Sequence, residues 1–169
     1  MAREKVELTI PTLVILLSLI TGILIYFIPR PIITQIYENY AENYQVIEVN
    51  PRVFIYLDTD SSITIRRNEP IQIELIRGGA SFDIQEAQSK ILDQLEIIIG
   101  DARITNKGTR FNIKIYDKRS EITITDGQIE LHLPSQKYLI DSGRKIEIDN
   151  NQIITDNIIN QTEVPPWLK

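Results

Sequence analysis

The sequence contains no cysteine and only one histidine among its 169 residues. Without cysteine there is no disulfide, thiolate zinc site, iron–sulfur cluster or cysteine nucleophile. A single histidine is too few for a multi-histidine metal site and disfavours a Ser/His/Asp triad. We therefore expect no metal ion, no cofactor and no enzymatic activity.

A surplus of basic residues is also missing. Lys and Arg total 18 against 23 for Asp and Glu, which gives a formal net charge of −5. A protein that binds nucleic acid needs a surplus of positive charge to displace counterions from phosphate groups. The charge balance thus argues against nucleic acid as a partner.

One stretch lacks charge altogether. No charged residue occurs from Leu8 to Pro29. At a rise of about 1.5 Å per residue, an apolar helix of this length spans the hydrocarbon core of a bilayer, about 30 Å thick. The alternative is a cleaved signal peptide, but that class has a shorter apolar region and a small-x-small cleavage site. We predict one transmembrane helix over residues 8–29, with the membrane-facing anchor residues Leu13, Leu16, Leu17, Ile20, Leu24, Tyr26 and Phe27.

The basic residues that flank this run predict its orientation. Two precede it and one follows it, and cytoplasmic flanks carry the excess of Lys and Arg. Residues 1–7 are therefore predicted to be a short cytoplasmic tail, with the rest of the chain outside the cytoplasm.

A stalk is predicted over residues 30–45, because Pro29 and Pro31 end the helix. Within it, apolar residues recur at steps of three and four, which is typical of an amphipathic helix. Such a helix lies on the membrane or on the following domain, or it offers a face to a partner. If the helix faces a partner, the candidate interface residues are Tyr37, Tyr40 and Tyr44.

From Val46 onward the apolar period changes to two. Alternating strands are predicted at 62–66, 71–75, 80–84, 111–115, 121–125, 129–133 and 145–149. Turn residues such as Asp126-Gly127 and Asn150-Asn151 separate them. A helical turn within Gln85–Gln94 interrupts the series.

Each alternating strand has one apolar and one polar face. This pattern favours antiparallel sheets packed face to face. The fold class is therefore all-β, an antiparallel β-sandwich or jelly-roll-like domain over residues 46–156, with a short β-solenoid as the alternative. Strand parity predicts one shared core that contains Ile63, Ile65, Ile73, Leu75, Phe82, Ile84, Phe111, Ile113, Ile122, Ile124, Ile129, Leu131, Ile146 and Ile148.

The last residues, 157–169, form a polar tail that carries the only tryptophan. Trp167 follows Pro165-Pro166, a combination that docks on a partner or remains a loosely held end. We retain Trp167 as a fourth candidate interface residue.

Four motifs, in order, resemble the FecR-like periplasmic domain. They are Leu75-Ile-Arg-Gly-Gly-Ala-Ser-Phe-Asp-Ile84, Gly108-Thr-Arg-Phe-Asn-Ile113, Ile122-Thr-Ile-Thr-Asp-Gly-Gln-Ile-Glu-Leu131 and Ile140-Asp-Ser-Gly-Arg-Lys-Ile-Glu-Ile148. The family's Glu after the first glycine is Gly79 here. The motif residues are turn glycines and core residues, and we expect a Cβ to clash at each glycine. The structural motif residues are Gly78, Phe82, Gly108, Thr109, Phe111, Gly127 and Gly143.

The resemblance implies an anchored binding or sensing module in the inner membrane of a bacterium, with its β-domain in the periplasm. FecR-like sigma regulators carry a longer cytoplasmic segment than the seven residues found here, so the regulatory output is expected from another chain. We expect a single-pass envelope protein that binds a protein partner, in signalling or as an assembly subunit. The alternative is a jelly-roll lipid carrier similar to the tethered subunit of lipopolysaccharide export.

Three other groups of polar residues have simple structural explanations. His132 alternates with two leucines and is expected on a polar strand face. Asp58 and Asp60 are compatible with a calcium ligand set, but a polar turn accounts for them equally well. The remaining acids lie on the wet faces of strands, where solvation explains them.

Overall fold

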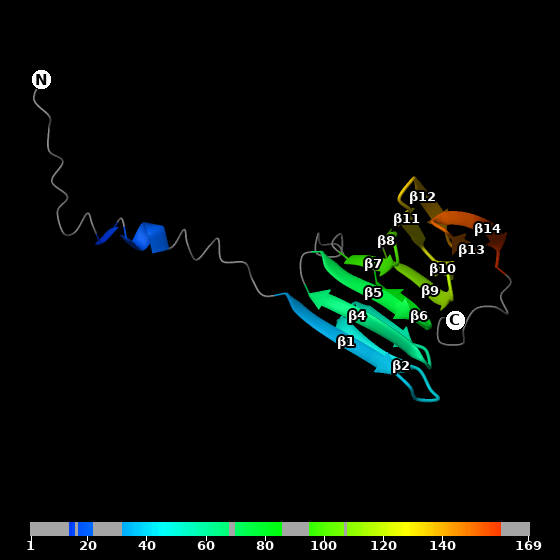
Figure 1. Ribbon diagram of the computed structural model, residues 1–169, viewed down its shortest axis with the longest axis horizontal. Helices are drawn as coiled ribbons and strands as arrows, with labels where there is room; N and C mark the ends of the chain where they lie inside the picture. The colour runs from blue at the N-terminus through cyan, green and yellow to red at the C-terminus, as the bar shows by residue number, and fades with distance from the viewer. Residues whose placement is uncertain are drawn as a thin grey trace, which may run out of the picture. The chain divides into compact units, whose positions relative to one another are not determined.

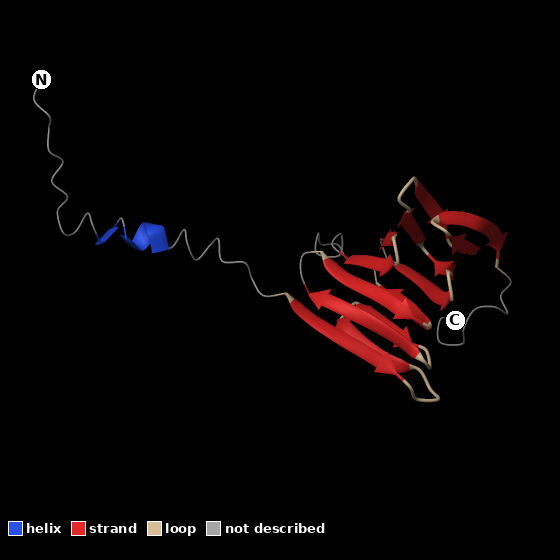
Figure 2. Cartoon of the chain, in the orientation of Figure 1, coloured by secondary structure: helices blue, strands red, loops and turns tan. Residues whose placement is uncertain are grey.

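The computed structural model describes residues 14–15, 17–21, 32–67, 70–85, 95–106 and 108–159. Contacts divide the chain into two compact units, Met1–Pro31 and Ile32–Lys169. The described parts of the second unit are built almost entirely of strands (Figures 1 and 2).

In the first unit the described residues are helical. They include Leu17 and Ile20, whose side chains are exposed. No helix among the described residues is long and apolar enough to cross a membrane. The other predicted anchor residues, Leu13, Leu16, Leu24, Tyr26 and Phe27, lie outside the described residues. The transmembrane helix therefore stays a prediction.

The described strands of the second unit form two seven-stranded sheets. Sheet A has the order β1 (Ile33–Asn39), β4 (Ser61–Arg67), β5 (Ile71–Arg77), β7 (Leu95–Ile99), β8 (Ala102–Asn106), β11 (Gln128–His132) and β12 (Lys137–Asp141). Sheet B has the order β2 (Gln45–Asn50), β3 (Val53–Leu57), β6 (Gly79–Ile84), β9 (Thr109–Tyr116), β10 (Arg119–Asp126), β13 (Arg144–Asp149) and β14 (Gln152–Ile158). The predicted all-β sandwich is thus confirmed.

Both sheets grow in chain order. The chain adds strands alternately to one sheet and to the other, so that β1 and β2 end at one lateral edge and β12 and β14 at the other (Figure 1). All described ladders are antiparallel except the one between β5 and β7. A short solenoid advances in a similar way, but its neighbouring strands are parallel.

The core lies between the sheets. All seven predicted strands are present, and all fourteen residues predicted to point inward are buried. Phe82 and Phe111 pair directly across β6 and β9. Their rings stack with centroids 5.0 Å apart, and both side chains are 0% exposed.

The four motif glycines share one position in the fold. Each lies where the chain passes from one sheet to the other, and each has a positive φ. At Gly78, between β5 and β6, a Cβ would lie 2.8 Å from the Cα of Ser61 and 2.9 Å from the carbonyl oxygen of Asp60. At Gly127, between β10 and β11, it would lie 2.6 Å from Cγ2 of Thr109. At these crossings only glycine fits.

The expected clash at Gly143 is wrong. A Cβ there would have nothing within 4 Å, so the constraint comes from its φ of +82° alone. Among the other motif residues, Thr109 is the first residue of β9, and its side chain is buried next to Gly127.

The helical stalk is also wrong. Residues Ile33–Asn39 form β1, which pairs with β4 throughout its length. The compact β-unit therefore begins at Ile32 and not at Val46. The apolar spacing resembled a helix because Ile36 points away from the core, which breaks the alternation of a strand; pairing with β4 overrides that local signal. Residues 86–94, within which a helical turn was predicted, lie outside the described residues.

Candidate functional site

One end of the sandwich gathers several turns, and we call it the turn end. It consists of the turns at 40–44, 58–60, 100–101, 117–118 and 150–151. Strand registers place them together, because neighbouring antiparallel strands reverse at the same end and β7 runs parallel to β5. Turns that a rigid sheet holds in place are the usual position of binding residues.

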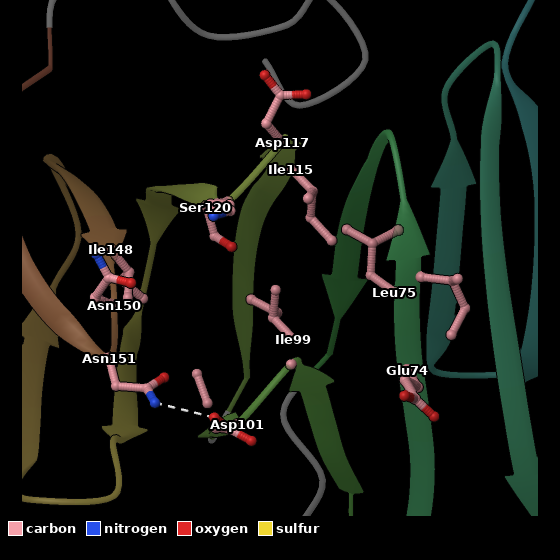
Figure 3. A pocket seen from close by; sticks show the side chains of 14 residues that line it. Glu74, Leu75, Ile99, Asp101, Ile115, Asp117, Ser120, Ile148, Asn150 and Asn151 are labelled. Carbon is pink, nitrogen blue, oxygen red and sulfur yellow. Dashed lines mark hydrogen bonds between the residues drawn. The ribbon is translucent and has the colours of Figure 1, made fainter.

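A cleft of about 490 Å³ opens among these turns. Its walls come from β5, β9 and the turns after β7, β9 and β13 (Figure 3). Apolar side chains of Leu75, Ile99, Ile115 and Ile148 line it together with polar residues of the turns. Because both sheets contribute to the cleft, its shape depends on the assembled sandwich.

A hydrogen bond joins the two sheets beside the cleft. The Asn151 side-chain amide donates to the Asp101 carboxylate at 3.0 Å, as the dashed line in Figure 3 shows. Asn150 and Asn151 both adopt positive φ values, 48° and 61°. Asn tolerates this conformation better than most residues, and the tight turn aims its side chain at the neighbouring sheet.

Exposed aromatic and apolar side chains lie at the same end. Tyr116 ends β9 next to the 117–118 turn and is 54% exposed, and Ile76 of the cleft wall is 50% exposed. Tyr40 is 63% exposed. The Arg77 guanidinium donates to the Tyr40 hydroxyl at 2.9 Å and lies 5.2 Å from the centre of its ring. Exposed Tyr and Arg are the residue types that most often anchor protein interfaces.

The predicted interface residues do not form one stripe. Tyr37 lies on β1 and packs against the core. Tyr40 contacts Arg77 of sheet A, whereas the ring of Tyr44 meets Tyr56 of sheet B edge to face, with centroids 5.6 Å apart. Trp167 lies outside the described residues. Of the predicted tyrosines, Tyr40 and Tyr44 remain available at the turn end.

Sequence reasoning missed Tyr116. The signal was present, because Phe111, Ile113 and Ile115 follow the inward parity of β9 and Tyr116 falls directly before the Asp117-Lys118 turn. A large aromatic residue on the wet parity beside a turn has no role in the core. It is a surface feature that needs another explanation.

Asp58 occupies space that a side chain at position 79 would need. The family motif has Glu after its first glycine, and here a Cβ on Gly79 would collide with the Asp58 carboxylate. Burial raises the pKa of Asp58 above its ordinary value of 3.8, and the positive charge of Lys114 opposes that rise. Keeping the Asp58 carboxylate charged at the turn end therefore costs desolvation energy, which the positive charge of Lys114 offsets in part.

We expect Asp58→Asn to stabilise the β-unit at neutral pH, because it removes the cost of burying a charge. An acid whose folded pKa is raised contributes stability below its unfolded pKa and loses it as pH rises through the folded value. The gain in the variant should shrink as pH falls and disappear below about 3.8, the ordinary pKa of the group. Denaturant unfolding of both proteins across pH 3 to 7 measures this. A gain that persists at the lowest pH would contradict the assignment.

Several other acids of the described strands pair with basic neighbours. Glu74 binds Arg66 at 2.8 Å, and Lys145 binds Glu121 at 2.9 Å. His132 lies on the outer face of sheet A, 3.1 Å from Glu130, so its predicted position on a polar face is confirmed. Among the described residues no cluster of three or more His, Asp or Glu is placed to hold a metal ion.

A family model described as FecR protein matches residues 37–130, more than half of the chain. The chain belongs to the FecR family. The matched segment runs from the end of β1 into β11 and includes four of the five turns at the turn end.

Two solved structures resemble this FecR chain. Both are described as a candidate anti-sigma factor from Parabacteroides distasonis ATCC 8503, one at 2.50 Å and one at 1.65 Å resolution. The first has a TM-score of 0.68 and 15% identity, over 80% of this chain and 65% of that one. The second has a TM-score of 0.63 and 15% identity, over 79% of this chain and 64% of that one. At this identity the likeness shows the fold, and the FecR chain spans about 65% of the length of the solved chains.

A comparison with curated proteins finds no match for this chain.

Proposed function

We propose that this FecR protein is a single-pass signalling protein of the bacterial inner membrane, and that its β-domain binds a protein partner at the turn end in the periplasm. The observation that carries the proposal is the placement of exposed Tyr40 and Tyr116 at the same end as a cleft, within the segment that matches the family. The description of two fold neighbours as candidate anti-sigma factors supports a regulatory role.

The charge of the turn end supports a basic partner surface. The turns carry Glu42, Asp58, Asp60, Asp101 and Asp117 against Lys118, and Arg77 beside Tyr40 is a second basic residue at this end. Opposite charge on a partner steers association and fixes orientation more than it adds affinity. The tyrosines would supply the contact area, and the acids would select among partners.

The interior supports protein binding over lipid transport. A lipid carrier needs an open apolar groove between its sheets. Here the largest inward side chains, such as Phe82, Phe111 and Leu57, are 0% exposed and leave no such channel among the described strands. The cleft at the turn end is rimmed by Asp, Asn and Lys, which suit a polar protein surface better than an acyl chain.

The test places a photoreactive amino acid at Tyr116 or Tyr40 of the full chain in the cells that produce it. We expect irradiation to give one covalent product with a single other protein, and the double variant Tyr40→Ala/Tyr116→Ala to lose that protein on purification in mild detergent. Leu139, which is 68% exposed on the edge strand β12, is the matched control position.

The double variant should keep the thermal midpoint of the wild-type chain, since both tyrosines are exposed. Equal cross-linking from Leu139 and Tyr116 would contradict a specific turn-end site. Extraction of labelled lipid from membranes by the purified chain would instead support the lipid carrier.

A further inference from the structure

Strand β1 is an unusually open edge of sheet A. It is seven residues long and pairs with β4 on one side without any irregularity of register. No described strand pairs with its other side. Free edges normally carry Lys, Pro or a bulge that prevents further pairing, and Ile33–Asn39 contains none of these.

The other three free edges are each protected. The ladders of β2 and β14 contain register irregularities, at Glu48/Asn50 and at Glu147/Ile148. β12 has only five residues and carries Lys137 and Asp141 at its ends. The contrast singles out β1 as the edge that is able to accept another strand.

β1 also exposes apolar side chains. Ile36 is 68% exposed on the outer face of the sheet, and Ile33 is 58% exposed. An added strand would hydrogen-bond to the backbone along this edge and would also cover the exposed isoleucine side chains. Both contributions would stabilise the pairing.

The charge along β1 selects the orientation of that strand. Thr34 lies beside Arg66 of β4 and Ile33 lies beside Arg67, whereas Glu38 is near the opposite end. Arg67 donates to the Gln35 side chain and to the carbonyl of Val49, and no ion pair of Arg67 or Glu38 occurs within the described part of the chain. Arg66 is already paired with Glu74, so the unbalanced positive charge at the start of the edge comes from Arg67, and Glu38 supplies the negative charge toward its end.

We propose that β1 pairs antiparallel with β1 of a second copy of this chain, with Ile36 opposite Ile36 at a two-fold axis. This register places Thr34 opposite Glu38 of the other copy, so that each Glu38 lies toward the end of the neighbouring strand that is flanked by Arg67. Parallel pairing would place Glu38 against Glu38. The contact is isologous and closes after two copies, and it leaves the turn end free for a different partner.

The absence of cysteine gives a direct test in the full chain. In antiparallel pairs the Cα atoms of directly opposite residues lie about 4.5 or 5.5 Å apart, within the range of about 4.4–6.8 Å that a disulfide bridges. We expect mild oxidation of Ile36→Cys in detergent to give a covalent dimer of twice the 19.5 kDa chain mass. Leu139→Cys is the control, because Leu139 is also 68% exposed and also lies on an edge strand.

Two further variants test register and charge. A mixture of Thr34→Cys and Glu38→Cys chains should cross-link faster than either variant alone. Glu38→Lys added to Ile36→Cys should slow dimer formation, because it brings Lys toward Arg67 of the other copy.

The proposal is overturned if Ile36→Cys forms no dimer, or if it forms one no faster than Leu139→Cys, since collisions within micelles would explain the latter. It is also overturned if Ile36→Cys cross-links only to a different protein. Circular dichroism of each variant confirms that the β-unit is folded. A failure of this test leaves the partner at the turn end unaffected, because the two surfaces share no residue.

Discussion

Replacing Phe111 with alanine should lower the free energy of unfolding by about 3–5 kcal/mol, the range for removing a large side chain from a packed core. Phe111 is 0% exposed and stacks on Phe82 at the centre of sheet B. The two aromatic side chains belong to neighbouring strands, so the cavity would be bounded by sheet backbone that relaxes little. Equilibrium unfolding in urea of the compact unit Ile32–Lys169 measures the loss.

The matched control is Tyr116→Ala on the same strand. Its side chain is 54% exposed, so the change in stability should stay within about 0.5 kcal/mol, as for most surface substitutions. A loss of less than about 1 kcal/mol for Phe111→Ala, a value typical of the surface, would mean that the core is not packed as described.

The second large effect is expected at Gly78. Gly78→Ala should cost more than about 3 kcal/mol, beyond most single substitutions. The new Cβ would meet backbone of the β3–β4 crossing at 2.8 Å, and the φ of +76° is itself unfavourable for alanine. Backbone cannot rotate away as a side chain can. The Ser61 hydroxyl also accepts a hydrogen bond from the Gly79 amide at 2.8 Å, which holds Ser61 close to this crossing.

Gly143→Ala separates the two causes. Its φ is +82° but no atom lies within 4 Å of the added Cβ, so only the conformational cost of about 1–2 kcal/mol should appear. Thermal and urea unfolding of the two variants side by side give the comparison. Equal losses of unfolding free energy in Gly78→Ala and Gly143→Ala would show that the close approach of Gly78 to the β3–β4 crossing adds nothing to the cost.

The sequence predicts the strands that alternate cleanly, and their inward residues, because burial on one face alone imposes a period of two. It fails where that condition fails. Leu95–Ile99 contains three consecutive isoleucines and therefore does not alternate. Ile33–Asn39 is an edge strand with an isoleucine in water, and its spacing matches a helix as well as a strand.

The turn end is harder to predict than the core. Asp101 and Asn151 are 50 positions apart and form a hydrogen bond only because β7 and β13 end at the same place in different sheets. That meeting depends on the parallel pairing of β5 with β7, which no local pattern encodes. The spacing that points to Tyr40 is typical of a helix, but the structure forms a strand there. Tyr40 lies beside Arg77 because it belongs to the β1–β2 loop.

The chain-order growth of the two sheets has a consequence for how the domain forms. The described ladder partners that are farthest apart in sequence, Gly79 and Lys114, are 35 positions apart. Contact order is therefore low for an all-β protein, which favours fast folding. Each hairpin finds its docking edge among residues already synthesised, so the domain is suited to folding progressively from its N-terminal strands. By the same logic, a hairpin added to or removed from the β12–β14 edge would leave the order of the strands before it unchanged.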